Sequence, residues 1–265
     1  MTEPLRIGNV PPPSCGIAVM AKASTPGRTK TRLVPPLTAE EAAAFNTAFL
    51  QDVAANILSA SHRIRISAYM AFGPPESVGF FNAMLPPGIG LIESWLPNFG
   101  DCLLKAITHL LALGHGAAVV LNSDSPTLPT ALLIDTARIL ARPGDRAVIG
   151  PSMDGGYYLL GLKMAHRRLF EAIDWSTERV ARQTMERARE IGLPVHVLPT
   201  WYDVDELDAL RLLHSELCEG QSFAPDLAPH QAPRTAELMR ALLDEADLAA
   251  RLQIAPARRV KKVGG

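Results

Sequence analysis

The chain is poor in several features that would point to a secreted, metal-clustered or membrane protein. It has three cysteines, Cys15, Cys102 and Cys218, and no two of them are spaced as a CxxC pair. A disulfide framework or a cysteine-based zinc site is therefore not expected, and a reducing cytoplasm is the expected compartment. The chain also has no apolar run of the ~18 residues that span a bilayer, and residues 1–14 lack the apolar stretch of a secretory signal.

Charge of one sign is not in excess either. The 265 residues include 26 basic and 27 acidic side chains, which gives a formal net charge of −1. Without a strong positive field, neither nucleic acid nor an anionic membrane surface is an expected partner. The apolar share of 48% and the charged share of 20% are ordinary for a globular protein. The length suits one large α/β domain or two small ones.

Strand-like and helix-like patterns alternate along the chain. Strands are expected at residues 16–22, 63–70, 117–122, 146–150, 157–162 and 194–198, with a short one near 89–92. Helices are expected at residues 38–60, 101–113, 130–140, 177–191, 205–217 and 235–252. Strands that alternate with helices of this length favour a mainly parallel, or mixed, sheet with helices on both faces, which is a three-layer α/β/α sandwich.

The composition changes near Gly220. Residues 1–220 contain every expected strand, so we expect them to form one domain. Residues 225–233 are rich in proline, and residues 221–265 are therefore expected to be a linker with an appended helix. Ligands of parallel sheets bind at the carboxyl ends of the strands, so the loops that follow the strands are where a site is expected.

A basic loop follows the first expected strand. Residues 22–32 hold four basic side chains and four hydroxyl groups. Backbone N–H groups, lysine and arginine all donate hydrogen bonds to phosphate oxygens, so this loop is a candidate phosphate-binding loop, with a solvated basic loop as the alternative. It is not a Walker A loop, because Thr29 rather than glycine precedes Lys30. The candidate phosphate-binding residues are Lys22, Gly27, Lys30, Thr31 and Arg32.

Acidic residues follow two later strands. Ser123 and Asp124 come directly after the apolar strand at residues 117–122, and Asp203 and Asp205 follow the last strand. Hard oxygen ligands suit hard cations, so we expect Asp124, Asp203 and Asp205 to hold Mg²⁺ or Mn²⁺ against phosphate oxygens. Ser123 is expected beside them as a nucleotide contact. The alternatives are an Asx turn at Asp124 and helix capping at Asp205.

A glycine-rich turn lies between two expected strands in the second half of the chain. Asp154, Gly155 and Gly156 fall in this turn, where glycine lets the backbone approach a ligand closely. A hairpin turn of the Asp-Gly type is the alternative. Trp175 precedes an expected helix, where it either packs beneath the helix cap or stacks on an acceptor. Asp52, in the first helix, is predicted to be a surface acid.

Taken in order, these motifs resemble those of a bacterial transferase family that is often called glycosyltransferase-like. The resemblance covers roughly residues 16–212 and rests on the segments at residues 22–33, 123–129, 154–157, 175–177 and 203–205. It implies the GT-A type, or nucleotide-diphospho-sugar transferase, fold, with phospholactate and molybdenum cofactor guanylyltransferases as more distant relatives. One departure from the family pattern is Asn122, where the family usually has glycine.

The resemblance also implies roles for the singled-out residues, within a nucleotide-binding transferase domain at residues 1–220. The basic loop would line the nucleotide phosphates, and Asp124 would bind the metal with Asp203 or Asp205. Transfer from a nucleotide leaves charge on phosphate oxygens, and cations aimed at that charge stabilise the transition state. The residues implied in catalysis are Lys30, Arg32, Asp124 and Asp154. Those implied on the sugar or acceptor side are Asp154, Gly155, Gly156 and Trp175.

Three functions are compatible with this sequence. The first is a glycosyltransferase that moves a sugar from a nucleoside diphosphate sugar to a small acceptor with the help of Mg²⁺ or Mn²⁺. The second is a nucleotidyltransferase that couples a nucleoside triphosphate to a phosphorylated acceptor and releases pyrophosphate. The third is a non-catalytic nucleotide-binding protein. Nucleotidyltransferases of the fold that this chain resembles often carry a Gly-Gly pair in the first loop, so by this resemblance the single Gly27 favours the first function over the second. The three acids near phosphate favour an enzyme over the third.

Overall fold

A seven-stranded sheet forms the centre of the computed structural model, which describes residues 14–245 and 247–254. The strand order is β3-β2-β1-β4-β6-β5-β7, in which β6 runs antiparallel to both of its neighbours and the other pairs are parallel. The strands are β1 (Cys15–Lys22), β2 (Ile66–Gly73), β3 (Ile89–Glu93), β4 (Ala117–Leu121), β5 (Ala147–Pro151), β6 (Tyr157–Leu162) and β7 (Val195–Val197). The mainly parallel, mixed sheet expected from the sequence is therefore confirmed.

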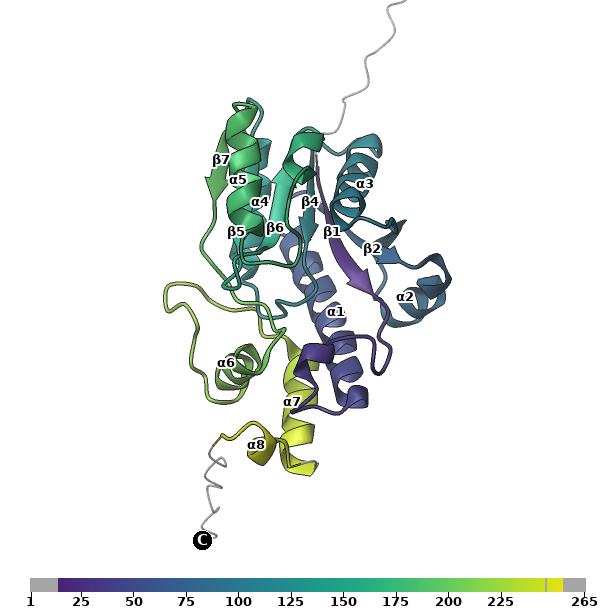
Figure 1. The fold of residues 1–265 in the computed structure, drawn as a ribbon, viewed down its shortest axis with the longest axis vertical. Helices are drawn as coiled ribbons and strands as arrows, with labels where there is room; N and C mark the ends of the chain where they lie inside the picture. Colours follow the sequence, from purple (N-terminus) through teal and green to yellow (C-terminus); the bar gives the residue numbers. More distant parts are fainter. Residues whose placement is uncertain (1–13, 246, 255–265) are drawn as a thin grey trace, which may run out of the picture.

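Helices cover both faces of this sheet (Figure 1). They are α1 (Ala39–Ser61), α2 (Val78–Met84), α3 (Phe99–Ala112), α4 (Thr130–Ala141), α5 (Val180–Glu190), α6 (Leu207–Cys218), α7 (Pro233–Glu245) and α8 (Leu248–Arg251). One apolar cluster packs α1 and α4 against the sheet and includes Phe45, Leu133 and Val119. A second cluster packs α3 and α5 against the sheet and includes Leu103 and Val120. Because consecutive strand residues point to opposite faces, Val119 and Val120 show that the layers are α/β/α.

Helix α1 follows directly from its local sequence. The Thr38 hydroxyl accepts a hydrogen bond from the Glu41 N–H, and the Glu41 carboxylate accepts one from the Thr38 N–H, so the expected capping box is present. The apolar stripe of the helix, from Phe45 through Phe49 to Ile57, is fully buried. This stripe holds α1 against β1 and β2, and the loop that joins β1 to α1 is thereby fixed at both ends.

Strand β4 lies in the middle of the sheet, between β1 and β6. All five of its residues are buried, which agrees with the prediction that an entirely apolar strand occupies a central position. A central parallel strand delivers the residues that follow it to the ligand-binding edge of the sheet. Ser123 and Asp124 are therefore placed at that edge by the position of β4.

Residues 72–97 contain more regular structure than their glycine and proline content predicts. Strand β2 extends to Gly73 because it pairs with the whole of β1, down to Lys22. Helix α2 then buries Phe81, whose ring centroid lies 5.4 Å from that of Phe72. A helix of two turns gives too few residues for a periodic pattern, so its sequence could not be told from a loop.

The C-terminal segment packs against the main body of the protein along α1 (Figure 1). The single helix expected at residues 235–252 is divided into α7 and α8, and both Met239 and Leu252 are fully buried. The proposed division into residues 1–220 and 221–265 stays a prediction. In the described part of the chain, no helix is long and apolar enough to cross a membrane.

The prediction that Asp52 is a surface acid is wrong. Its side chain is fully buried, and its two carboxylate oxygens accept hydrogen bonds from the N–H groups of Arg234, at 3.1 Å, and Thr235, at 2.8 Å. The first N–H groups of a helix have no partner within the helix, so the start of α7 supplies donors for Asp52. A buried carboxylate is tolerated where it is hydrogen-bonded in this way.

Candidate functional site

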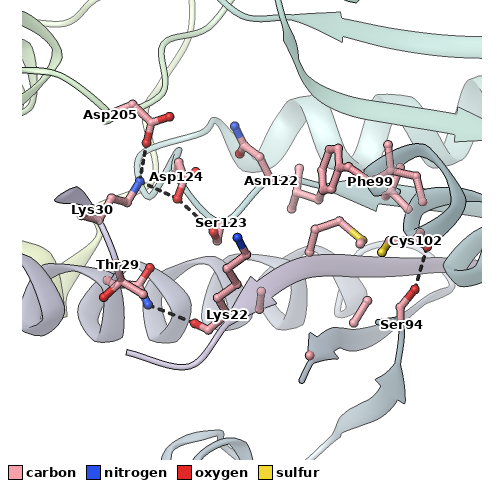
Figure 2. Close-up of a pocket in the computed structure, with 18 of the residues that line it drawn as sticks. Lys22, Thr29, Lys30, Ser94, Phe99, Cys102, Asn122, Ser123, Asp124 and Asp205 are labelled. Carbon is pink, nitrogen blue, oxygen red and sulfur yellow. Dashed lines mark hydrogen bonds and ion pairs between the residues drawn. The ribbon is translucent and has the colours of Figure 1, made fainter. Parts of the chain in front are cut away.

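A cleft of about 360 Å³ opens at the carboxyl ends of β1 and β4 (Figure 2). Its charged end is formed by the loop after β1 together with the segments that follow β4 and β7. Its apolar end is formed largely by the first turn of α3, with Phe99 and Leu103. The cleft therefore lies where the parallel-sheet rule places a ligand.

Lys30 joins the two acidic segments at the charged end of the cleft. Its ammonium lies 2.6 Å from Oδ1 of Asp124 and 2.8 Å from Oδ1 of Asp205, and it donates a hydrogen bond to the carbonyl of Val204 at 2.9 Å. Figure 2 shows the two carboxylates converging on this one cation. The Lys30 side chain is only 5% exposed, and it lies 5.3 Å from the centroid of the Phe49 ring. The basic loop and the two acidic segments thus meet at one point.

The backbone supports this convergence. Lys30 has a left-handed conformation, with φ 52° and ψ 37°, and directly precedes the helical turn that begins at Thr31. The N–H of Val204 donates to the carbonyl of Asp124 at 2.8 Å and ties the two acidic segments together. Arg32 adds a second cation, since its guanidinium lies 2.6 Å from Oδ2 of Asp205. Two cations and two carboxylates therefore form one network.

The charges in this network shift the pKa values of its members. Burial by itself would lower the pKa of Lys30, but the carboxylates of Asp124 and Asp205 raise it, so the ammonium stays charged. Burial would raise the pKa of Asp205, yet Lys30 and Arg32 hold it below its usual range. Asp203 is shifted the other way, because burial and then the neighbouring carboxylates raise its pKa to about 7. The three acids expected at a metal site are thus close enough to influence one another.

The remaining residues of the expected phosphate site lie in or beside the cleft. Lys22 and Thr31 line it, and Lys22 is exposed at the end of β1. Ser123 also lines it and donates its hydroxyl proton to Oδ1 of Asp124 at 2.9 Å. Gly27 does not line the cleft; its φ of 73° marks it as a turn residue.

The glycine-rich turn between β5 and β6 is not part of the cleft lining. Asp154 Oδ1 accepts a hydrogen bond from the Gly156 N–H at 2.8 Å, as in an Asx turn. Gly155 has a φ of +86°, and a Cβ there would lie 2.1 Å from the carbonyl oxygen of Glu178. The geometry therefore gives these residues a turn-forming role, and their expected part on the sugar or acceptor side stays a prediction.

Trp175 lies outside the cleft lining but touches a residue that belongs to it. Its ring meets that of Phe99 edge to face, with the centroids 5.4 Å apart. A Cβ on Gly100 would lie 2.8 Å from the Trp175 ring, so glycine is needed where the indole packs against α3. An acceptor-stacking role for Trp175 also stays a prediction.

Several cleft residues were not singled out in the sequence. Asn46, within the buried face of α1, donates to the carbonyl of Lys22 and to the hydroxyl of Ser24, and it thereby holds the start of the basic loop. A polar residue inside an apolar helical stripe was the signal that could have revealed it. Asn122 and Tyr157 also line the cleft. The sequence marks Asn122 only as a departure from the family pattern and Tyr157 only as the end of the segment at residues 154–157, so neither is predicted to be a site residue.

Comparison with known proteins gives one family match and a set of similar structures. A family model described as an uncharacterized protein conserved in bacteria (DUF2064) matches residues 57–177. No protein with curated annotation shows significant sequence similarity to the chain. The matched segment contains Asp124, Asp154 and Trp175 but not the basic loop.

Two solved structures have a fold similar to that of this chain. A protein of Desulfovibrio desulfuricans G20, provisionally assigned as a nucleotide-diphospho-sugar transferase, is 25% identical and superposes with a TM-score of 0.75 over 90% of this chain and 96% of that one. A CMP:2-keto-3-deoxy-manno-octonic acid synthetase in complex with CTP shares the fold alone, with 11% identity and a TM-score of 0.50 over 78% of this chain and 100% of that one. The chain therefore belongs to the nucleotide-diphospho-sugar transferase superfamily, as its motifs predicted, and is an enzyme of the transferase class.

Proposed function

We propose that this transferase moves a sugar from a nucleoside diphosphate sugar to a small acceptor. The observation that carries the proposal is the Lys30 ammonium between Asp124 and Asp205, because it brings the basic loop and the acids to one point at the ligand-binding edge of the sheet. The similar structure from Desulfovibrio desulfuricans, assigned to this type of donor, supports it.

The basic loop would bind the diphosphate of the donor. Lys22 and Arg32 line the cleft with exposed charged groups, so a phosphate can reach both of them. When the bond between the sugar and the diphosphate breaks, negative charge grows on the leaving phosphate oxygens. Fixed cations aimed at that position stabilise the transition state more than the ground state. The loop would therefore serve both binding and catalysis.

The acidic pair fits a divalent cation. Asp124 and Asp205 direct one carboxylate oxygen each at the Lys30 ammonium, so a divalent cation would have to bind beside this ammonium or take its place. Carboxylate oxygens are the ligands that Mg²⁺ and Mn²⁺ prefer. Among residues 14–245 and 247–254, no three acidic, histidine or cysteine side chains are grouped so as to hold a metal by themselves. Mg²⁺ is commonly held by one or two carboxylates with substrate phosphates and water, so a pair suffices. A bound cation would neutralise charge on the diphosphate.

A thermal-shift panel tests nucleotide and metal binding. The protein is heated with UDP-glucose, GDP-mannose and the four nucleoside triphosphates, each with Mn²⁺ or with EDTA. We expect a nucleotide sugar to raise the Tm in Mn²⁺, since a ligand of the folded state stabilises it by mass action, and EDTA to remove most of the effect. Arg32→Ala should weaken binding roughly tenfold, because charge-assisted hydrogen bonds are lost. Arg138→Ala on α4 is the control, because its exposure of 63% matches the 61% of Arg32.

The products distinguish glycosyl transfer from nucleotidyl transfer. Release of a nucleoside diphosphate from a nucleotide sugar, followed by ³¹P NMR, would support the proposal. Release of pyrophosphate from a nucleoside triphosphate would replace it with the nucleotidyltransferase alternative, which uses the same basic loop and acids. Binding without either product, for any acceptor tried, would favour a nucleotide-binding protein. Equal Tm values with and without every nucleotide would refute nucleotide binding altogether.

A further inference from the structure

The floor of the cleft contains two buried polar atoms that have no partner in the described part of the chain. They are Oδ1 of Asn122 and the hydroxyl oxygen of Tyr157. Other buried polar atoms without a partner exist, such as Oγ1 of Thr184 on α5, but Asn122 and Tyr157 are the cleft-lining residues among them. A buried polar atom without a hydrogen bond destabilises the protein, so these two are expected to have a partner in the functional complex.

The sheet brings the two residues together. Asn122 follows β4 and Tyr157 begins β6, and these strands are neighbours. The N–H of Asn122 donates to the carbonyl of Tyr158 at 2.8 Å, which fixes the backbone of both segments. Tyr157 packs against the apolar cluster on the α3 and α5 face, which also contains Val120, two residues before Asn122. Both Asn122 and Tyr157 line the same cleft.

The two residues lie where the charged end of the cleft passes into its apolar end. Figure 2 shows Asn122 between the charged network of Lys30, Asp124 and Asp205 on one side and Phe99 on the other. Toward the apolar end, the cleft is lined by Met20, Phe99, Leu103 and Val120. A ligand that begins at the phosphates and passes Asn122 therefore enters an apolar space that offers a small number of hydrogen-bonding groups. Such a space selects an uncharged group with a defined pattern of donors and acceptors.

We propose that Asn122 and Tyr157 determine the specificity of the enzyme by hydrogen-bonding an uncharged ring of the donor next to its phosphates. The amide oxygen of Asn122 accepts from an N–H or O–H of that ring, and the Tyr157 hydroxyl donates to a ring oxygen or nitrogen. The inference rests on the proposed function, because it takes the phosphates to lie at the basic loop. Three rings of a nucleotide sugar have this chemistry, the nucleobase, the ribose and the transferred sugar, and the ligands of the experiment separate the nucleoside from the transferred sugar.

Isothermal titration calorimetry of three variants tests the proposal. The variants are Tyr157→Phe, which removes only the hydroxyl; Asn122→Leu, which keeps the side-chain size; and Thr184→Val as the control. The ligands are UDP-glucose, UDP, GDP-mannose, GDP and pyrophosphate, all with Mn²⁺. We expect Tyr157→Phe and Asn122→Leu each to weaken the tightest of the nucleotide ligands roughly three- to tenfold, the range for one neutral hydrogen bond, and Thr184→Val to leave it unchanged. Pyrophosphate should bind all four proteins equally.

The pattern of losses identifies the part of the donor that is contacted. A loss that is already seen with the free diphosphates UDP or GDP assigns the contact to the nucleoside, that is, to the nucleobase or its ribose. A loss confined to UDP-glucose or GDP-mannose assigns it to the transferred sugar. Unfolding measurements give an independent check, because removal of an unsatisfied hydroxyl should leave the Tyr157→Phe protein at least as stable as the parent. Since this variant removes one atom from a fixed ring, it keeps the test decisive if Asn122→Leu fails to fold.

Two outcomes would overturn the inference in distinguishable ways. If the parent binds a nucleotide and the Tyr157 and Asn122 variants bind it equally well, the specificity assignment fails and the proposed function stands. If the parent binds none of the nucleotides, the proposed function fails and the specificity assignment fails with it.

Discussion

At the scale of single residues, Lys30 is the side chain on which the site depends. It is nearly buried, and its charge is compatible with that burial because two carboxylates lie within 2.8 Å of the ammonium. Removal of one partner from a buried ionic group is costly, since the remaining charges lose their compensation while they stay out of water. Lys30 is therefore expected to contribute to the stability of the protein, and its part in phosphate binding stays a prediction.

Lys30→Ala should lower the free energy of unfolding by about 1–3 kcal/mol, less than for a fully buried pair because both acids are partly exposed. Urea denaturation in EDTA measures the loss. Mn²⁺ should then raise the Tm of this variant more than that of the parent, because the two acids are left without their cation. Lys105→Ala, which breaks an exposed contact with Glu93 at 3.6 Å, is the control and should change little. An equal Mn²⁺ effect on parent and variant would argue against a shared cation position.

A second residue-scale feature lies away from the cleft, at His115. The Ser14 hydroxyl is 2.6 Å from Nδ1 and the Tyr69 hydroxyl is 2.8 Å from Nε2 of this ring. Burial lowers the pKa of His115 below its ordinary value of 6.5. The neutral ring can donate with one nitrogen and accept with the other, so both hydroxyl groups are satisfied.

The lowered pKa of His115 predicts the direction of a pH effect. The unfolded chain takes up a proton on His115 near pH 6.5, while the folded protein resists protonation, so the stabilisation is complete above pH 6.5 and is lost as the pH falls through the folded-state pKa. The parent should therefore lose more stability than His115→Gln between pH 7.5 and pH 5. Urea unfolding of both proteins at the two pH values gives the comparison. The opposite order would show that the ring is stabilised in its charged form.

At the scale of elements, α1 and α7 are in contact although they are distant in the sequence. Asp52 on α1 and Arg234 on α7, which are hydrogen-bonded, are 182 positions apart. Asp52 accepts hydrogen bonds from two N–H groups at the beginning of α7. The acid of one helix thus completes the hydrogen bonding of the other.

Asp52→Ala should destabilise the protein by about 2 kcal/mol, because it removes a helix cap and leaves buried N–H groups unpaired. Equilibrium unfolding in urea measures the change. Ser59→Ala, on an exposed position of the same helix, is the control and should change the free energy of unfolding by a few tenths of a kcal/mol at most. A neutral effect of Asp52→Ala would mean that water replaces the carboxylate at the start of α7.

At the scale of the whole molecule, the sheet and the cleft belong to residues 15–205, while the C-terminal helices cover the outer side of α1. Arg251 connects this outer layer to the beginning of α1 and to the segment just before it. Its guanidinium donates to both carboxylate oxygens of Glu41 and to the carbonyl of Pro36. The hydrogen bonds from the Arg251 guanidinium lower the pKa of Glu41. Burial raises it by a smaller amount, so the pKa stays below its usual value.

A fragment of residues 1–220 should fold, because it contains all seven strands, the whole of one apolar cluster and most of the other. It should have a lower Tm than the full chain, since α1 loses its contacts with Met239 and Leu252 and Asp52 loses its donors. Circular dichroism during heating compares the two proteins. An insoluble or unfolded fragment would show that residues 221–265 are part of the domain rather than an appendage.

Much of the architecture could be predicted because it depends on neighbouring residues. The capping box of Thr38 and Glu41 acts within one helical turn, and the apolar residues 117–121 are compatible only with a central strand. Strand ends then indicated which side chains share an edge, and Lys30, Asp124 and Asp205 do meet there. The roles of Asp154 and Trp175 are still predictions, because neither side chain lines the cleft.

What the sequence determined by itself is therefore the order of strands and helices, the α/β class and the edge at which the charged residues gather, since these follow from local periodicity and from the geometry of parallel sheets. The tertiary structure alone decided that Asp52 is buried under α7, that Lys30 bridges two acids, and that Asn122 and Tyr157 share the floor of one cleft. Each of these facts is a contact between segments that are distant in the chain. Such contacts are set by how the elements pack, and no local pattern records them.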